Sequence, residues 1–298
     1  MLIVGCGDIG MRLAQLVRGR WRVYALSRSE RQHDVLRGLG AIPLVADLDR
    51  PATLERHVGV AHDVIHLVPP PRTGRRDTRT ENLVRALSKG GSLPQRLVYM
   101  STSGVYGDCA GALVSETRPA MPMSERARRR AHAERVLRNW GAESGTLVTV
   151  LRVPGIYAAG RLPLGRLKTG TPALVQDQDA YTNHIHADDL ARIVLAALVR
   201  GKGGRTYNAS DDSCMKMGDY FDLVADRFGL PHPPRVSWER AQSTVPTTLL
   251  SFTRESRRLS NERLKKELRV RLRYPSVYEG IEAVRPQWQN HPAVSFLC

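Results

Sequence analysis

The chain has 298 residues, 42% of them hydrophobic, which is enough to bury a full α/β core. Its 45 basic residues outnumber 29 acidic ones and give a formal charge of +16, but they are spread along the chain without a zinc-finger or helix-turn-helix pattern, so we expect no nucleic-acid partner. Its four cysteines are widely separated, which argues against disulfides and zinc. No apolar run is long enough to span a bilayer, so we expect a cytoplasmic protein without membrane contact.

The first residues have the pattern of a buried strand, a glycine turn and a helix. Gly5, Gly7 and Gly10 follow an apolar triplet and precede the periodic run 11–17. Gly5 permits the tight turn, Gly7 lets the backbone approach a pyrophosphate, and Gly10 lets the helix pack closely on the strand. The helix N-terminus supplies free N–H groups and a positive dipole end. With a second strand at 22–26, the segment predicts a βαβ unit that binds a dinucleotide.

The residues after the second strand indicate which nicotinamide nucleotide is expected. An NAD site usually places a carboxylate there for the ribose 2′-hydroxyl, whereas an arginine accommodates a 2′-phosphate. This chain has Ser27, Arg28 and Ser29 at that point. A hydroxyl and a guanidinium bind a phosphate through charge-assisted hydrogen bonds. The sequence therefore favours NADP over NAD, and Glu30 is the alternative contact to the ribose.

Strands and helices then alternate, as in a parallel sheet with crossover helices. Strands are expected at 41–46, 63–68, 96–100 and 147–152, and helices near 29–39, 81–87 and 124–140. A helix at 188–199, capped by Asp188, and a strand at 205–208 return to the sheet. We predict an α/β fold, a Rossmann-type doubly wound parallel sheet with a smaller C-terminal substrate-binding region.

The alternation fades after residue 157, where the chain becomes rich in proline and charge. Residues 1–157 and about 181–208 are predicted to form the NAD(P)-binding domain. Residues from about 158 to 180 and from 209 to 298 are predicted to form a smaller substrate or lid region.

His184 and His186 stand close to Asp188 and Asp189, and all four are metal-ligand types. A helix start explains the aspartates better, and no third ligand stands at metal-site spacing. We therefore expect no metal site.

Several segments resemble, in order, the NAD-dependent epimerase/dehydratase family of the extended short-chain dehydrogenases/reductases. They are the opening glycines and residues 101–107, 151–157 and 183–191. The resemblance covers residues 2 to about 208. It implies that Asp47 and Leu48 contact the adenine, and that the C-terminal portion closes over a small hydroxyl or carbonyl substrate.

In that family a Ser or Thr, a Tyr and a Lys carry the chemistry, and Thr102 fits the first role. Aligning the helix at 124–140 with the family's Tyr-x-x-x-Lys motif places Arg126 at the tyrosine and Arg130 at the lysine. Arg130 can still bind a ribose. Arg126 cannot replace tyrosine as a proton donor, because a guanidinium keeps its proton at neutral pH.

Two functions stay open on this sequence. The first is an NADP-dependent oxidoreductase in which another group moves the proton, with Ser103, Tyr106 and Tyr157 nearby, and Arg126 holds an anionic substrate. The second is a catalytically silent NADP(H)-binding sensor or interaction protein. Proton transfer by a tuned side chain typically contributes about 10²- to 10⁴-fold, so the loss of the tyrosine matters in either case.

The helix that carries Arg126 is strongly basic. Arg128, Arg129 and His132 are expected on its solvated face, and the helix is a candidate interface for a homodimer. The expected catalytic residues are Thr102, Arg126 and Arg130. The expected cofactor contacts are Gly5, Gly7, Asp8, Ile9, Gly10, Ser27, Arg28, Asp47, Leu48, His66, Leu67, Val68, Arg130, Pro154 and Tyr157.

Overall fold

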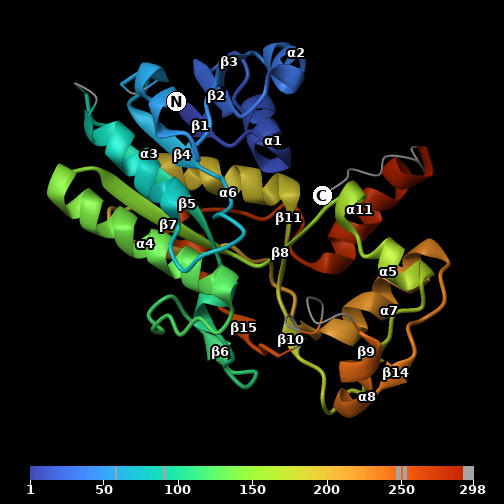
Figure 1. The fold of residues 1–298 in the computed structure, drawn as a ribbon. Coiled ribbons are helices and arrows are strands. Elements are labelled where there is room, and N and C mark those ends of the chain that lie inside the picture. Colours follow the sequence, from blue (N-terminus) through green and yellow to red (C-terminus); the bar gives the residue numbers. More distant parts are fainter. Residues whose placement is uncertain (58, 90–91, 246–249, 251–253, 291–298) are drawn as a thin grey trace.

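The computed structural model describes residues 1–57, 59–89, 92–245, 250 and 254–290. Its centre is a seven-stranded sheet in the order β12-β7-β5-β4-β1-β2-β3, with every neighbouring pair parallel (Figure 1). The strands are β1 (Leu2–Val4), β2 (Val23–Ser27), β3 (Ala41–Val45), β4 (Asp63–His66), β5 (Arg96–Thr102), β7 (Leu147–Val153) and β12 (Thr206–Asn208). The predicted Rossmann-type sheet is confirmed.

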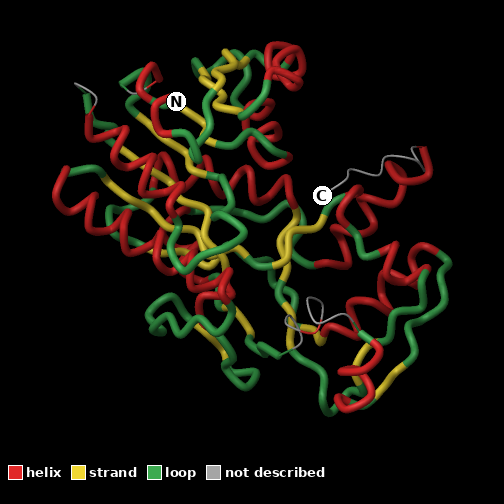
Figure 2. Tube along the Cα trace, viewed as in Figure 1, coloured by secondary structure: helices red, strands yellow, loops and turns green. Residues whose placement is uncertain are grey.

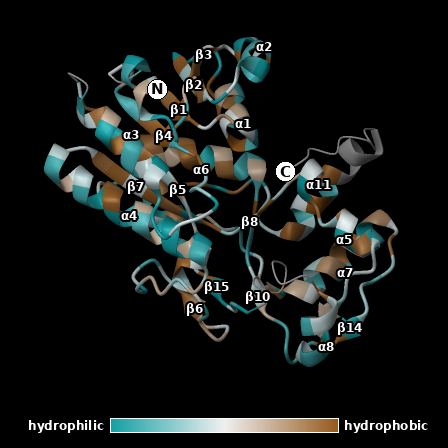
Figure 3. Cartoon of the chain, viewed as in Figure 1, coloured by the Kyte–Doolittle hydropathy of each residue, from teal (hydrophilic) through white to brown (hydrophobic). Residues whose placement is uncertain are grey.

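The two faces of the sheet are covered by different helices, because successive strand residues point to opposite sides. Ile3 and Ile65 pack in one core and Val4 and Val64 in the other. The first core lies under α1 (Asp8–Leu16), α2 (His33–Gly38), α6 (Ala187–Arg200) and α10 (Glu262–Leu268). The second lies under α3 (Thr78–Lys89) and α4 (Glu125–Ser144). Figure 3 shows apolar strands between helices that are polar on their outer sides.

The strand order reverses at β1, which pairs with β2 on one side and β4 on the other. Ligands of open parallel sheets bind at such a switch point, outside the carboxyl ends of the strands. Short 3₁₀ helices surround this edge: η1 (Glu30–Gln32), η2 (Pro51–Thr53), η3 (Glu55–His57), η4 (Ser103–Tyr106) and η5 (Ala159–Arg161). The fold thus places a crevice above Gly5.

A second group of elements lies beside the sheet (Figures 1 and 2). Its helices are α5 (Leu164–Lys168), α7 (Met217–Phe228), α8 (Trp238–Thr244) and α11 (Val277–Asn290). The paired short strands are β6 (Leu113–Val114) with β15 (Arg258–Leu259), β8 (Gly155–Tyr157) with β11 (His184–His186), β9 (Ala173–Leu174) with β14 (Arg235–Val236), and β10 (Tyr181–Thr182) with β13 (Met215–Lys216). Phe221, Val224, Val277 and Ile281 form its own core.

Some expected boundaries differ in the structure. Helix α6 begins at Ala187, and its N-cap is His186, whose Nδ1 accepts from the backbone N–H of Asp188 (3.2 Å). Asp188 is therefore inside the first turn and not the cap. Leu264 and Leu268 of α10 pack in the core beneath α6, so this stretch of 209–298 adds to the sheet domain and not to the smaller region. Residues 246–249, 251–253 and 291–298 of the expected lid lie outside the described residues.

No helix in the described part of the chain combines the length and apolar character that a membrane span requires. The same residues contain no group of three or more histidine, cysteine, aspartate or glutamate side chains arranged to hold a metal ion.

Candidate functional site

A cavity of about 470 Å³ opens at the switch point above the glycine turn. Gly5 has φ +96°, a region open to glycine, and a Cβ there would lie 2.7 Å from the side chain of Val68. A Cβ on Gly10 would lie 2.9 Å from the carbonyl oxygen of Gly5. A Cβ on Gly7 would meet nothing within 4 Å. The turn is therefore tight at Gly5 and Gly10 and open toward the cavity at Gly7.

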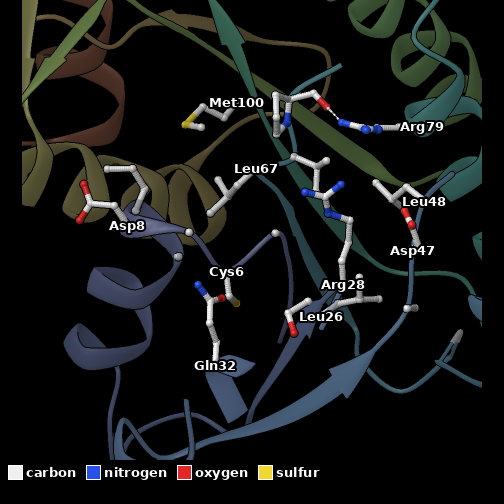
Figure 4. A pocket seen from close by; sticks show the side chains of 18 of the residues that line it. Cys6, Asp8, Leu26, Arg28, Gln32, Asp47, Leu48, Leu67, Arg79 and Met100 are labelled. Atoms are coloured by element: carbon white, nitrogen blue, oxygen red, sulfur yellow. Dashed lines mark hydrogen bonds between the residues drawn. The ribbon is translucent and has the colours of Figure 1, made fainter. Parts of the chain in front are cut away.

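Most of the expected cofactor contacts line this cavity. They are Gly5, Gly7, Asp8, Ile9, Gly10, Ser27, Arg28, Asp47, Leu48, Leu67, Val68 and Arg130. In Figure 4, Arg28, Leu48 and Asp47 lie on the side of the cavity away from Asp8. A dinucleotide would therefore run from the end of β2, across the glycine turn, toward the end of β5.

Three expected contacts do not line this cavity. His66 is fully buried in β4, where its Nε2 lies 2.9 Å from the hydroxyl of Thr80. Burial, helped by the charge of Arg130, lowers the pKa of His66 to about 3, so the ring is neutral. Pro154 and Tyr157 line a different cavity, because the chain turns away from the nucleotide crevice after β7. The structure therefore places these three residues outside the lining of the first cavity.

Arg79 lines the first cavity and was not expected there. It forms a two-pronged ion pair with Asp49 (2.9 and 2.7 Å) and donates to the carbonyl oxygen of Pro69 (3.0 Å), the bond drawn in Figure 4. The pair lowers the pKa of Asp49. Arg79 comes from the first turn of α3, which begins before the expected residue 81. It therefore fixes the loop after β4 against the loop after β3.

Arg130 is held between the ends of the central strands. Its Nη1 donates to the carbonyl oxygens of Val68 (3.2 Å) and Met100 (2.9 Å) and to the hydroxyl of Tyr99 (3.1 Å). The side chain is buried but still borders the cavity. A cation is thereby fixed at the end of the cavity near β5.

A second cavity of about 400 Å³ adjoins the first. Ile156 and Arg161 line both, and Arg161 pairs with Asp8 at the glycine turn (3.0 Å). The second cavity also receives Thr102 and Ser103 from the end of β5, and Arg126 from the first turn of α4. Arg126 and Arg130 thus face neighbouring cavities, as their i,i+4 spacing predicts.

Two tyrosines expected near the site are engaged elsewhere. The hydroxyl of Tyr106 donates to Asn208 (2.8 Å), and its ring lies under the guanidinium of Arg152. The hydroxyl of Tyr157 donates to the carbonyl oxygen of Ser276 (3.2 Å). Burial raises the pKa of both phenols. Neither hydroxyl is presented as a proton donor to the second cavity.

The basic helix α4 is more buried than expected. Arg128 is exposed and pairs with Glu125, but Arg129 is buried and donates to the carbonyl oxygen of Gly74. His132 is not a surface residue either: its side chain is only 12% exposed, and it lies 3.3 Å from Glu81 of α3. The loop at 72–77 and helix α3 cover this side of α4. The run of charged residues in α4 did not indicate that this side would be covered.

Residues of the C-terminal segment complete the second cavity. Glu255 and Arg257 line it, although they are far in sequence from Thr102. The Nη1 of Arg257 donates to the carbonyl oxygen of Gly107 (2.7 Å) and to Glu255 (2.9 Å). Tyr181 and Tyr220 also border this space. No local motif in the sequence distinguishes these residues from other charged or aromatic positions.

Comparison with known proteins agrees with this architecture. The family model "NAD dependent epimerase/dehydratase family" matches residues 1–210. The chain belongs to the NAD-dependent epimerase/dehydratase family. The resemblance stated from the sequence is thereby confirmed. The search of curated protein sequences found no match.

Solved structures of similar fold include members of this family. A functionally unknown conserved protein from Silicibacter pomeroyi is 30% identical, with a TM-score of 0.81 over 96% of this chain and 98% of that one. The dTDP-glucose 4,6-dehydratase DesIV from Streptomyces venezuelae, solved with NAD, is 18% identical, with a TM-score of 0.79 over 98% and 97%. UDP-glucose 4-epimerase from Thermotoga maritima, solved with UDP-glucose, is 20% identical, with a TM-score of 0.79 over 97% and 98%.

Proposed function

We propose that this epimerase/dehydratase family member is an NADP(H)-dependent oxidoreductase. It binds the dinucleotide in the first cavity and a small hydroxyl or carbonyl substrate in the second. The observation that carries the cofactor choice is the lining at the end of β2, where Ser27, Arg28 and Gln32 border the cavity. Glu30, the alternative ribose contact, is exposed and is not among the lining residues.

The residues present fit a dinucleotide. The N-terminus of α1 offers free N–H groups beside the open Gly7, which suits a pyrophosphate. Arg28 would pair with the 2′-phosphate, Asp47 and Leu48 would border the adenine, and Arg130 would hold the nicotinamide ribose. When bound, the nicotinamide supplies hydride transfer.

Polar residues of the second cavity would orient the substrate. Thr102 stands at the end of β5 and can hydrogen-bond a substrate oxygen. Arg126 presents guanidinium donors but has no proton to give at neutral pH. The proton must therefore come from another cavity group or from water.

The alternative is a catalytically silent NADP(H)-binding sensor or interaction protein. The replacement of the tyrosine position by Arg126 favours it, as does the engagement of the Tyr106 and Tyr157 hydroxyls within the fold. NADPH binding without turnover of any carbonyl compound or nucleotide sugar would select this alternative over the enzyme.

The cofactor assignment is tested by calorimetric titration with NADPH and NADH. We expect wild type to bind NADPH more tightly. Arg28→Asp should weaken NADPH by roughly 10- to 100-fold and NADH much less, because it removes a charge-assisted contact to the 2′-phosphate. Arg22→Asp is the matched control, since Arg22 is exposed at the opposite end of β2. Equal losses for both nucleotides in Arg28→Asp would contradict the assignment.

The remaining expectations complete the proposal. The domain of residues 1–157 and about 181–208 binds the cofactor, and the smaller region closes over the substrate. The protein is cytoplasmic, and it forms a homodimer through α4. Gel filtration with light scattering tests the dimer, and a monomer would contradict it.

A further inference from the structure

The turn that is proposed to bind the nucleotide carries a carboxylate. Asp8 is the first residue of α1, lines the first cavity, and follows Gly7, beside which a pyrophosphate has room. A helix N-terminus attracts anions, because it carries the equivalent of about half a positive charge. A carboxylate at the same place opposes a second anion, since like charges repel. Asp8 must therefore be compensated before a pyrophosphate can bind there.

Two arginines compensate Asp8. Arg12, one turn further along α1, donates from Nε to Oδ1 of Asp8 (2.7 Å), and it also pairs with Asp188 at the start of α6. Arg161 approaches the other oxygen of the same carboxylate, with its Nε 3.0 Å from Oδ2. These four side chains form a chain of alternating charges that cancel one another. Without Arg161, the chain would leave one negative charge beside the position of the pyrophosphate.

Arg161 reaches the turn from a segment that is remote in sequence. It is the last residue of η5, which packs against β8 and α11. Its backbone N–H donates to the carbonyl oxygen of Ala158 (2.9 Å), and Ala158 is buried in the core beneath α1 and α6. The backbone at Arg161 is therefore fixed, whereas its side chain is 40% exposed and borders both cavities. The pair with Asp8 joins Nε, and a guanidinium carries four further N–H donors on Nη1 and Nη2.

We propose that Arg161 binds the pyrophosphate of the dinucleotide, together with the N-terminus of α1. Guanidinium groups form charge-assisted hydrogen bonds with phosphate oxygens, and the pair with Asp8 keeps the head group of Arg161 at the turn. Arg161 also borders the second cavity, so one side chain joins the cofactor cavity to the substrate cavity. This inference rests on the proposed function, because the pyrophosphate belongs to the proposed cofactor.

Calorimetric titration of Arg161→Gln tests the inference. NADPH, NADH and ADP-ribose share the pyrophosphate, so each should bind the variant roughly 10- to 100-fold more weakly than it binds wild type. 2′-AMP has no 5′-phosphate and should bind both proteins alike. Unchanged affinity for NADPH, or an equal loss for 2′-AMP, would overturn the inference. A loss confined to NADPH would place Arg161 at the 2′-phosphate and would overturn it as well.

Two further variants separate a phosphate contact from an ordinary surface ion pair. Arg161→Lys keeps the positive charge and should bind NADPH more tightly than Arg161→Gln does, so equal affinities of these two variants would contradict the inference. Arg227→Gln is the matched control: Arg227 is also 40% exposed and pairs with Glu282, but it is not among the described residues that line either cavity. It should bind NADPH as wild type does, and a loss as large as that of Arg161→Gln would show an effect of net charge alone. The midpoint of urea unfolding should stay that of wild type in all three variants, because exposed ion pairs contribute little to stability.

The proposed function and this inference fail in different ways. If neither NADPH nor NADH binds wild type, the proposed function is wrong, and ADP-ribose still measures the pyrophosphate contact. If ADP-ribose does not bind wild type either, both are wrong. If the nicotinamide nucleotides bind and Arg161→Gln matches wild type, only the role of Arg161 is wrong.

Discussion

The carbonyl oxygen of Gly5 lies 2.9 Å from the point where a Cβ on Gly10 would stand. This approach brings the first turn of α1 against the end of β1, so that the N-terminus of the helix points into the first cavity. A Cβ on Gly7, which lies between them in sequence, would meet nothing within 4 Å. The two glycines of this turn therefore serve different purposes: Gly10 lets the helix pack closely on the strand, and Gly7 leaves space in the cavity for a ligand.

Alanine substitutions should separate these purposes. Gly10→Ala is expected to lower the free energy of unfolding by about 1 to 3 kcal/mol, because its methyl group overlaps backbone that cannot move cheaply. Gly7→Ala should leave that free energy within about 1 kcal/mol of wild type but weaken NADPH at least about tenfold, since its methyl group occupies space the pyrophosphate needs. Urea unfolding and calorimetry measure the two quantities. NADPH affinity unaltered by Gly7→Ala would place the nucleotide elsewhere.

Arg126→Tyr tests the missing proton donor. The substitution puts a phenol beside Thr102, so reduction of neutral carbonyl compounds should rise, by up to the roughly 10²- to 10⁴-fold that proton transfer provides. NADPH absorbance follows the reaction. Arg128→Tyr, on the exposed side of α4, should have no effect. A loss of existing activity on neutral carbonyl compounds in Arg126→Tyr would instead show that the arginine contributes to turnover of those compounds.

Asp211 makes folding stability depend on pH. This aspartate is 3% exposed, and its backbone N–H donates to the carbonyl oxygen of His184, which lines the second cavity. Burial raises the pKa of Asp211 from 3.8 to about 7. Between these values the folded protein holds a proton on Asp211 that the unfolded chain has released, so the stability contributed by this aspartate falls as the pH rises toward 7. Linkage over pH 5 to 8 corresponds to a loss of roughly 3 kcal/mol.

Asp211→Asn should remove that contribution. Urea unfolding at pH 5 and pH 8 gives the change in free energy of unfolding for each protein. From pH 5 to pH 8 this change should be more positive in the variant than in wild type, by roughly 3 kcal/mol, because the opposite contribution of the buried, neutral His66 is the same in both proteins. Asp177→Asn is the control, because Asp177 is exposed. A slope identical to that of wild type in Asp211→Asn would show that the side chain titrates alike in the folded and unfolded chains.

Much of the sheet and the nucleotide crevice could be predicted because both depend on short-range pattern. In β1, Ile3 packs in one core, whereas its neighbours Leu2 and Val4 pack in the other. Successive residues of β4 alternate between the two cores in the same way. The glycine spacing and the Ser27-Arg28 pair follow their strands directly. These residues lie at the carboxyl edge of the sheet because the strands that precede them are parallel.

The features that the sequence did not indicate concern side chains whose partners are distant in sequence. Tyr157 follows a family motif, yet its hydroxyl turns to Ser276 of the C-terminal segment. Arg129 belongs to a charged run typical of a solvated face, but the carbonyl oxygen of Gly74 satisfies its head group beneath a loop. Local hydropathy cannot report such burial, because a guanidinium becomes buried only when a remote acceptor is present.

The sequence by itself determined the βαβ crevice, the family and the loss of the tyrosine at Arg126. Each of these can be recognised from short motifs, whose residues lie only a few positions apart. Only the tertiary structure brought Glu255 and Arg257 to the same cavity as Arg126 and Thr102. Their meeting depends on β15 pairing with β6 and on hydrogen bonds from the segment before β15 to the loop after β5. These contacts join segments about 150 residues apart, and no local pattern encodes them.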